Sequence, residues 1–130
     1  MADKAKPSPE EIEQFLENFK SCWDGNVVPR LDEKNDETLS SLGITPRHRA
    51  EEVKRLHYTD YFRGPSPDYD GIAGKEWWEF GLRVKGHEIY IKIRIYKRER
   101  GSYGGKCMSF HIAEEKITYP FKEKRDENHD

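Results

Sequence analysis

The sequence predicts an α+β fold in which N-terminal helices pack on one face of an antiparallel β-sheet. Apolar residues recur at helical spacing within the first 56 residues and alternate with polar residues from residue 76 onward. The turn Lys85-Gly86 joins two alternating segments closely, which is typical of antiparallel neighbours. We therefore expect one domain over residues 1–125, with helices within 8–56, a sheet within 76–121 and a disordered tail at 122–130.

Three helices are expected before the sheet. Ser8-Pro9-Glu10-Glu11 has the pattern of a capping box with proline in the first turn. A second helix is expected from Asp32 to Leu42, where Gly43 supplies a left-handed C-terminal residue. Thr45-Pro46 opens a third helix in the same way as the first. The first helix carries an apolar stripe made of Ile12, Phe15, Leu16, Phe19 and Trp23.

Three strands are expected after the helices, at Glu76–Val84, His87–Lys97 and Lys106–Ile112. The prolines and glycines between Gly64 and Gly74 predict a long loop before the first of them. The segment Tyr119–Phe121 is expected to form either a short terminal strand or a packed tail.

Composition limits the classes of function. The chain has 130 residues, of which 37% are charged, and it contains three Trp, seven Tyr and six Phe to build a small core. No apolar run approaches a membrane span and the N-terminus lacks a secretory signal, so we expect a cytoplasmic protein without membrane contact. Two cysteines are too few for a disulfide scaffold or a zinc site.

Charge is distributed unevenly although the formal net charge is only −2. Between Arg83 and Lys106 there are eight Lys or Arg residues and two acids, whereas Met1–Gly43 holds five basic and ten acidic residues. Such asymmetry suggests a basic working surface. The plainer alternative is a hairpin whose charges are simply solvated.

Alternation along the strands sorts the side chains by face. The isoleucines of the long strand must meet the helices, so Tyr90, Lys92 and Arg94 point the other way. By the same pattern Cys107, Ser109 and His111 are expected on that second face of the last strand. If the three strands are neighbours, one face gathers Glu79, Tyr90, Lys92, Arg94 and His111. An open antiparallel face is commonly polar because it meets water, which is the competing explanation.

The mixture of groups on that face suits RNA cleavage without a metal. A base removes the ribose 2′-hydroxyl proton, cations stabilise the phosphorane, and an acid protonates the leaving 5′-oxygen. His111 can serve in either proton-transfer role. The five histidines show no close spacing typical of metal ligands, and no phosphate-binding glycine loop follows a strand, so no metal or cofactor is expected. Tyr61 and Trp77 are candidates for stacking on a base.

Four segments of the chain resemble MqsR-type toxins of the RelE/ParE superfamily of bacterial toxin–antitoxin systems. They are Asp60-Tyr61-Phe62-Arg63, Trp78-Glu79, Glu88–Ile93 and Met108-Ser109-Phe110-His111. The resemblance spans residues 56–113. It implies a RelE/ParE-like fold, a metal-independent endoribonuclease that cleaves messenger RNA, and a cognate antitoxin as partner.

The resemblance also implies a catalytic set. Tyr90 matches the family's tyrosine, whereas Arg63 and His111 stand where the family has lysine and Glu79 stands where it has glutamine. In this reading Glu79 is the general base and His111 the general acid, or the reverse. Arg63 holds the scissile phosphate.

Lys92, Arg94 and Arg83 are expected to bind RNA. Two other readings stay open: an inhibitor of DNA gyrase, as in ParE relatives, and a regulatory module without catalysis. The cleavage preference, a requirement for the ribosome and the choice between monomer and homodimer are left open by the sequence.

Overall fold

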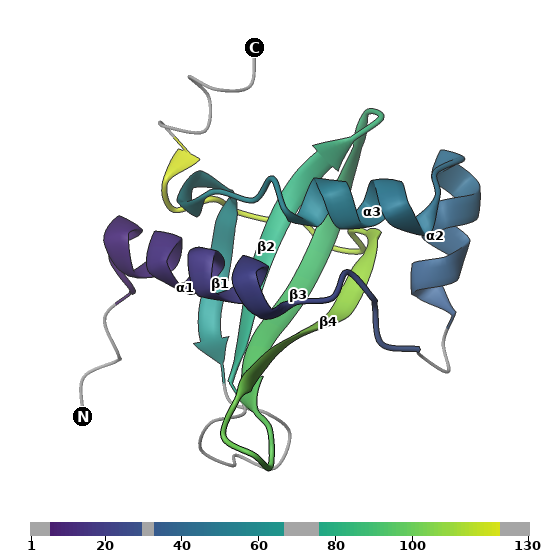
Figure 1. The fold of residues 1–130 in the computed structure, drawn as a ribbon. Coiled ribbons are helices and arrows are strands. Elements are labelled where there is room, and N and C mark those ends of the chain that lie inside the picture. The colour runs from purple at the N-terminus through teal and green to yellow at the C-terminus, as the bar shows by residue number, and fades with distance from the viewer. Residues whose placement is uncertain (1–5, 30–32, 67–75, 123–130) are drawn as a thin grey trace.

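A computed structural model describes residues 6–29, 33–66 and 76–122. Three helices precede the sheet: α1 (Pro9–Cys22), α2 (Lys34–Leu42) and α3 (Pro46–Val53), followed by a 3-10 turn at Tyr58–Asp60. Figure 1 shows α1 and α3 lying across one face of the sheet, with α2 beside its β4 edge. The predicted class, with N-terminal helices packed on an antiparallel sheet, is confirmed.

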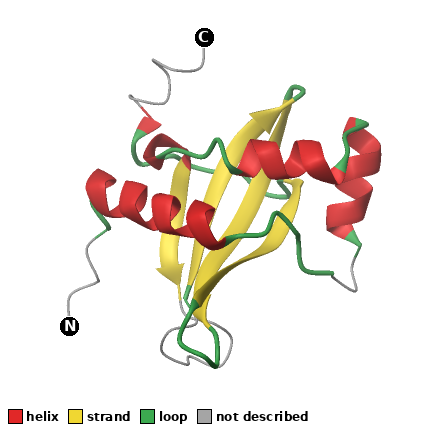
Figure 2. Cartoon of the chain, in the orientation of Figure 1, coloured by secondary structure: helices red, strands yellow, loops and turns green. Residues whose placement is uncertain are grey.

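The sheet is a four-stranded antiparallel meander in the order β1-β2-β3-β4, drawn in yellow in Figure 2. Its strands are β1 (Tyr61–Ser66), β2 (Trp77–Val84), β3 (His87–Lys97) and β4 (Tyr103–Ile112). The face toward the helices is the core. It contains Phe80, Leu82, Val84, Ile89, Ile91, Ile93 and Phe110. The opposite face is called the outer face below.

Helix α1 closes the core through its apolar stripe. The predicted capping box is present, because the Ser8 hydroxyl accepts from the Glu11 amide at 3.1 Å and the Glu11 carboxylate accepts from the Ser8 amide at 2.8 Å. Ile12, Leu16 and Phe19 are completely buried. Phe15 stacks on Trp78 of β2 with ring centroids 4.1 Å apart. Burial of each such side chain contributes about 1.5–3 kcal/mol.

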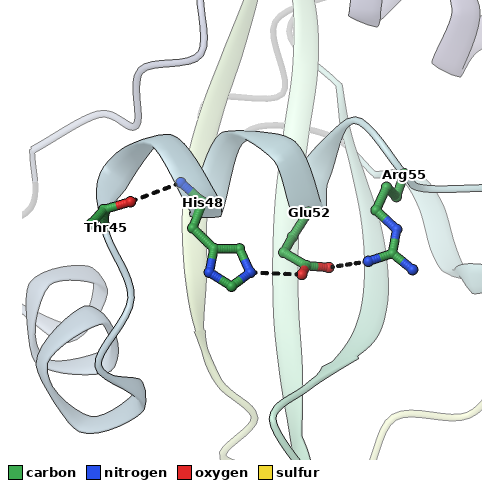
Figure 3. Close-up of polar contacts among 4 residues, drawn as sticks. All are labelled: Thr45, His48, Glu52 and Arg55. Atoms are coloured by element: carbon green, nitrogen blue, oxygen red, sulfur yellow. Dashed lines mark hydrogen bonds and ion pairs between the residues drawn. The ribbon is translucent and has the colours of Figure 1, made fainter.

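Helix α3 is stabilised by local polar contacts (Figure 3). The Thr45 hydroxyl accepts from the His48 amide at 3.0 Å and caps the first turn. One turn later, Glu52 contacts the His48 ring at 3.0 Å and Arg55 at 3.3 Å. These side chains lie along one side of the helix, so His48 has a structural role at this surface. On the side of α3 that faces the sheet, Val53 is fully buried, as is Leu56 just beyond the helix.

Helix α2 covers the free edge of β4. The Asn35 amide donates to the Met108 carbonyl and accepts from the Phe110 amide, both at 3.0 Å. Thr38 accepts from the Ile112 amide at 3.1 Å. Asn35 and Thr38 are buried and take the hydrogen bonds that a further strand would make, which protects the edge from pairing with other chains.

Two irregularities redirect side chains in the edge strands. Opposite β2, Tyr61 pairs with Phe80 and Arg63 with Glu79, so two residues of β1 span one step of β2. In β4 the register shifts between Ser109 and Cys107. Bulges of this kind turn the following side chains to the other face. The first places Arg63 beside Glu79, and the second returns Cys107 to the core.

Two sequence expectations are therefore wrong. Gly64 to Ser66 were assigned to a loop, but they belong to β1, where an irregular edge strand tolerates glycine and proline. Cys107 was expected on the outer face but is completely buried in the core opposite Ile93. Burial raises the pKa of its thiol to about 12, which keeps it protonated and inert.

The segment after β4 crosses the outer face from β4 toward the β1 side (Figure 1). Ile117 is buried there, and the Tyr119 hydroxyl donates to Glu88 of β3 at 2.6 Å. Phe121 then packs near Tyr61, with ring centroids 6.1 Å apart. Residues Tyr119–Phe121 were expected to form either a short terminal strand or a packed tail. The structure shows the packed tail. The expected disordered tail lies outside the described residues, except for Lys122.

Candidate active site

A cleft of about 350 Å³ lies on the outer face between the strands and the crossing C-terminal segment. This volume falls within the range of small-molecule sites. Tyr90 and His111 form its floor as direct cross-strand partners, with ring centroids 5.3 Å apart. The walls are formed by Lys34, Phe62, Arg63, Lys92, Ser109, Ala113, Glu114, Glu115 and Ile117. Three of the four predicted catalytic residues therefore meet at one cleft.

Glu79 lies beneath these residues and holds two of them. Its Oε1 accepts from the Tyr90 hydroxyl at 2.5 Å, and its Oε2 accepts from Arg63 Nε at 3.0 Å. The Glu79 side chain is 6% exposed and does not line the cleft. A 2′-hydroxyl in the cleft would therefore reach Glu79 only through Tyr90.

The surroundings of Tyr90 keep its hydroxyl protonated. Burial and the hydrogen bond to Glu79 raise its pKa well above that of a free tyrosine. The same carboxylate raises the pKa of Arg63, mainly by hydrogen bonding, so the guanidinium is a permanent cation at the cleft wall. Tyr90 is thus a proton donor toward Glu79, while its oxygen can still accept a proton or hydrogen bond.

His111 has a defined tautomer when neutral. Its Nδ1 lies 3.0 Å from the Ile112 carbonyl oxygen. A carbonyl can only accept, so Nδ1 must carry a proton, and Nε2 is the nitrogen that gains or loses one. Across residues 6–29, 33–66 and 76–122, no side chain hydrogen-bonds to Nε2. His111 is 7% exposed and lines the cleft, so the cleft is where its ring can meet a bound group.

The three predicted RNA-binding cations occupy different surroundings. Lys92 lines the cleft, with its ammonium 5.3 Å from the centre of the Trp77 ring. The Arg94 guanidinium lies 4.6 Å over the same ring, with Nε and Nη1 buried and without hydrogen-bond partners. Arg83 is exposed and does not line the cleft. It lies two residues after Gly81, the position of β2 over which the C-terminal segment crosses.

Neither aromatic residue proposed for base stacking is accessible. Tyr61 is 2% exposed within the core, and its hydroxyl donates to the Gly64 carbonyl at 2.5 Å. Trp77 is 4% exposed, beneath Lys92 and Arg94. Tyr61 belongs to the core and Trp77 supports the cations of the outer face, so neither ring serves as a stacking platform for a base.

Sequence reasoning missed one cation and two acids at the cleft. Lys34, at the start of α2, lies 2.8 Å from Glu114, and Arg63 lies 3.8 Å from Glu115. Lys34 is far along the chain from β3 and β4, and Glu114 and Glu115 lie just past the end of β4, where alternation no longer predicts a face. The pairing of α2 with β4 and the return of the C-terminal segment bring them together.

No cluster of three or more His, Cys, Asp or Glu residues in the described part of the chain is arranged to hold a metal ion. None of the helices among those residues is long and apolar enough to cross a bilayer. Comparison with protein-family models, with curated proteins and with solved structures finds no match to this chain.

Proposed function

We propose that this chain is the toxin of a bacterial toxin–antitoxin system and acts as a metal-independent endoribonuclease on messenger RNA. One observation carries the proposal: Tyr90 and His111 share the floor of a cleft whose walls hold Arg63 and Lys92. A phenol, an imidazole and two cations within one cleft are the groups that phosphodiester transfer requires. The resemblance of the strand segments to MqsR-type toxins supports the same activity.

The base in this mechanism is the Tyr90–Glu79 pair. The ribose 2′-hydroxyl gives its proton to Tyr90 Oη while the Tyr90 proton passes to Glu79 Oε1, along the 2.5 Å hydrogen bond. The 2′-oxygen then attacks the adjacent phosphorus. Tyr90 touches the substrate and is catalytic, whereas Glu79 acts through it. Glu79 is thus the final proton acceptor, as expected, but the proton reaches it through Tyr90.

His111 is the acid. In its protonated form Nδ1–H donates to the Ile112 carbonyl and Nε2–H faces the substrate. Nε2 gives its proton to the leaving 5′-oxygen as the P–O bond breaks. The products are a 2′,3′-cyclic phosphate and a 5′-hydroxyl. Arg63 and Lys92 stabilise the extra negative charge on the phosphorane, and general acid–base catalysis of this kind contributes about 10²–10⁴-fold in rate.

The proposal includes a cytoplasmic location, where messenger RNA is made, and a cognate antitoxin that covers the outer face or its rim. A homodimer is compatible with the sequence but is not needed, because all the proposed catalytic groups come from one chain. Whether cleavage occurs on the ribosome is not part of the proposed chemistry.

Induced expression in bacteria tests the function. Wild type should arrest growth with loss of messenger RNA, and His111→Ala should do neither. Growth arrest with intact transcripts would favour the gyrase inhibitor instead, since such a binder has no need of Tyr90 and His111 in one cleft. Absence of any growth effect from soluble, folded wild type would favour a regulatory module.

A further inference from the structure

The outer face continues beyond the cleft along the β3–β4 hairpin. Its cross-strand pairs are Tyr90–His111, Lys92–Ser109, Arg94–Lys106 and Tyr96–Gly104, in that order. The first two belong to the cleft, and the last two lead away from it. Because a strand rises about 3.3–3.4 Å per residue, Tyr96 lies about 20 Å from Tyr90.

At the far end, two cations flank an aromatic ring. The Arg98 guanidinium lies 5.5 Å and the Lys106 ammonium 5.0 Å from the centre of the Tyr96 ring. Arg98 is further held by a hydrogen bond to the Tyr103 carbonyl. Both contacts are of the cation–π type, which orders long charged side chains without neutralising them. We call Tyr96, Arg98 and Lys106 the hairpin platform.

Gly104 makes room for the hairpin platform. A Cβ atom at this position would lie 2.7 Å from Arg98 Nη2 and 2.8 Å from Tyr96 Cζ. The bare backbone of β4 therefore lets Arg98 and the Tyr96 ring lie flat across it. Arg98 and Lys106 are therefore ordered against the Tyr96 ring, although Lys97, Arg98 and Arg100 are exposed to solvent.

The charge of this region is not balanced locally. Residues 97–106 contain Lys97, Arg98, Arg100 and Lys106 against the single acid Glu99, within a chain whose formal net charge is −2. None of these cations forms an ion pair with an acid among the described residues. A surface of this kind is complementary to a polyanion.

We propose that the hairpin platform is an accessory binding site for single-stranded RNA, holding backbone phosphates of nucleotides that flank the scissile link. This inference rests on the proposed function, because the cleft supplies the other end of the track. The RNA strand would run from the cleft over Lys92 and Arg94 to the hairpin platform. Arg98 can also stack its guanidinium plane on an unpaired base.

The test measures how RNA affinity depends on RNA length. All proteins carry His111→Ala, so that bound RNA stays intact, and binding of labelled RNA of about 12 and about 4 nucleotides is followed by fluorescence anisotropy. The test variant is R98Q/K106Q. The control is R47Q/K54Q, which removes two exposed cations from α3 and its C-terminal end. Thermal unfolding of each protein checks that it is folded.

We expect R98Q/K106Q to weaken binding of the longer RNA at least about fivefold and to leave the shorter RNA unaffected, with the control within about twofold of its parent. Removal of two phosphate contacts should also make the plot of the logarithm of the association constant against the logarithm of salt concentration less steep, by about 1.4 in slope. Lys106→Gln alone should give an intermediate loss of affinity for the longer RNA. This variant keeps Arg98 and its hydrogen bond to Tyr103, so its loss cannot come from a loosened hairpin.

Unchanged affinity for the longer RNA would overturn the proposal, as would an equal loss in the control or an equal loss for both RNA lengths. These outcomes are separate from failure of the nuclease. Length-dependent binding by a wild type that cleaves no RNA would refute the proposed function and leave the hairpin platform standing. For comparison, R98Q/K106Q is also made with His111 retained. Cleavage of long RNA by this protein with the wild-type KM would refute the hairpin platform and leave the proposed function standing.

Discussion

The Tyr90 hydroxyl donates a hydrogen bond to Glu79 Oε1 at 2.5 Å, diagonally across the β2–β3 ladder. In register, Glu79 faces Lys92 and Tyr90 faces Gly81. The absence of a side chain at Gly81 leaves the space that the C-terminal segment occupies. The carboxylate is thus enclosed on the outer face and bound to Tyr90 on one oxygen and Arg63 on the other, which makes it the centre of the site.

Glu79→Gln should reduce kcat by about 100-fold or more, because the amide cannot take the Tyr90 proton. It should cost only about 1.5–3 kcal/mol of stability, the usual value for a lost hydrogen bond to a charged group. Purified protein is assayed for RNA cleavage at saturating RNA, and kcat of the variant is compared with that of wild type.

Glu88→Gln is the matched control for that change, since Glu88 also accepts a tyrosine hydrogen bond, from Tyr119 at 2.6 Å, but lies outside the cleft. It should keep the wild-type kcat. An equal loss of kcat in both variants would mean that Glu79 is only a structural residue. A wild-type kcat in Glu79→Gln would lead to the same conclusion.

Tyr90 should make the folded protein less stable in alkali. Burial and Glu79 raise its pKa above the value of 10.0 for a free tyrosine. Above about pH 10 the unfolded chain releases the proton while the folded chain retains it, so stability falls as pH rises, by up to about 1.4 kcal/mol per pH unit. Urea unfolding between about pH 9 and 11 should show a shallower fall for Tyr90→Phe.

The control for the alkaline experiment is Tyr103→Phe, because Tyr103 is 58% exposed on the hairpin. Its stability should follow the wild-type curve. Cys107 also keeps its proton in the folded state and therefore also lowers stability at high pH. Because Cys107 is present in all three proteins, its contribution cancels in the comparison. Parallel curves for wild type and Tyr90→Phe would contradict the described environment of Tyr90.

Lys34 and Glu114 should act on substrate binding rather than on chemistry. Their 2.8 Å ion pair is largely exposed, with side chains 36% and 61% accessible, and pairs of this kind contribute about 0–1 kcal/mol to stability. Lys34→Gln should raise KM for RNA about threefold or more at unchanged kcat, and Glu114→Gln should lower it, because the change removes one negative charge from the cleft wall.

The exposed α3 pair Arg47 and Glu51, 3.8 Å apart, supplies controls of the same charge. Neither Arg47→Gln nor Glu51→Gln should change KM by more than about 1.5-fold at about 0.15 M salt, where distant charges are screened. If Glu51→Gln lowered KM as much as Glu114→Gln does, the effect would come from net charge alone.

Gly81 should tolerate no side chain while the C-terminal segment is in place. A Cβ atom there would clash with Tyr119 Oη and lie 3.0 Å from Ile117 Cδ1. Gly81→Ala should destabilise the fold by about 1–3 kcal/mol, as overpacking does. Urea unfolding of Tyr119→Ala with and without Gly81→Ala gives the coupling, and the double variant should lose clearly less than the two single losses added. If the two losses of stability simply added, Tyr119 would not pack against Gly81, and the C-terminal segment would lie elsewhere.

The alternation along β2 and β3 was sufficient to predict which face of the sheet each side chain occupies. The isoleucines of β3 point into the core as expected, and Glu79, Tyr90, Lys92 and His111 do share the outer face. A strict period of two also explains the error at Cys107. The register shift in β4 interrupts the alternation, and nothing local in the sequence marks it.

The rest of the site depends on contacts between distant parts of the chain. Arg63 reaches Glu79 through the irregular pairing of β1, which no pattern in the sequence predicts. That Arg63 belongs to the site was expected only from the family resemblance. Lys34 is brought to the cleft by the Asn35 hydrogen bonds to β4. Glu114 and Glu115 arrive with a segment that has no regular structure. Long-range placements of this kind leave no periodic pattern.

The nature of the RNA ends tests the central claim most directly. Purified wild type and His111→Ala are incubated with 5′-labelled single-stranded RNA in the presence of a metal chelator, and the fragments are analysed by mass spectrometry. Wild type should yield fragments that end in a 2′,3′-cyclic phosphate, and His111→Ala should leave the RNA intact. Undegraded RNA with folded wild type, or equal cleavage by His111→Ala, would contradict the account.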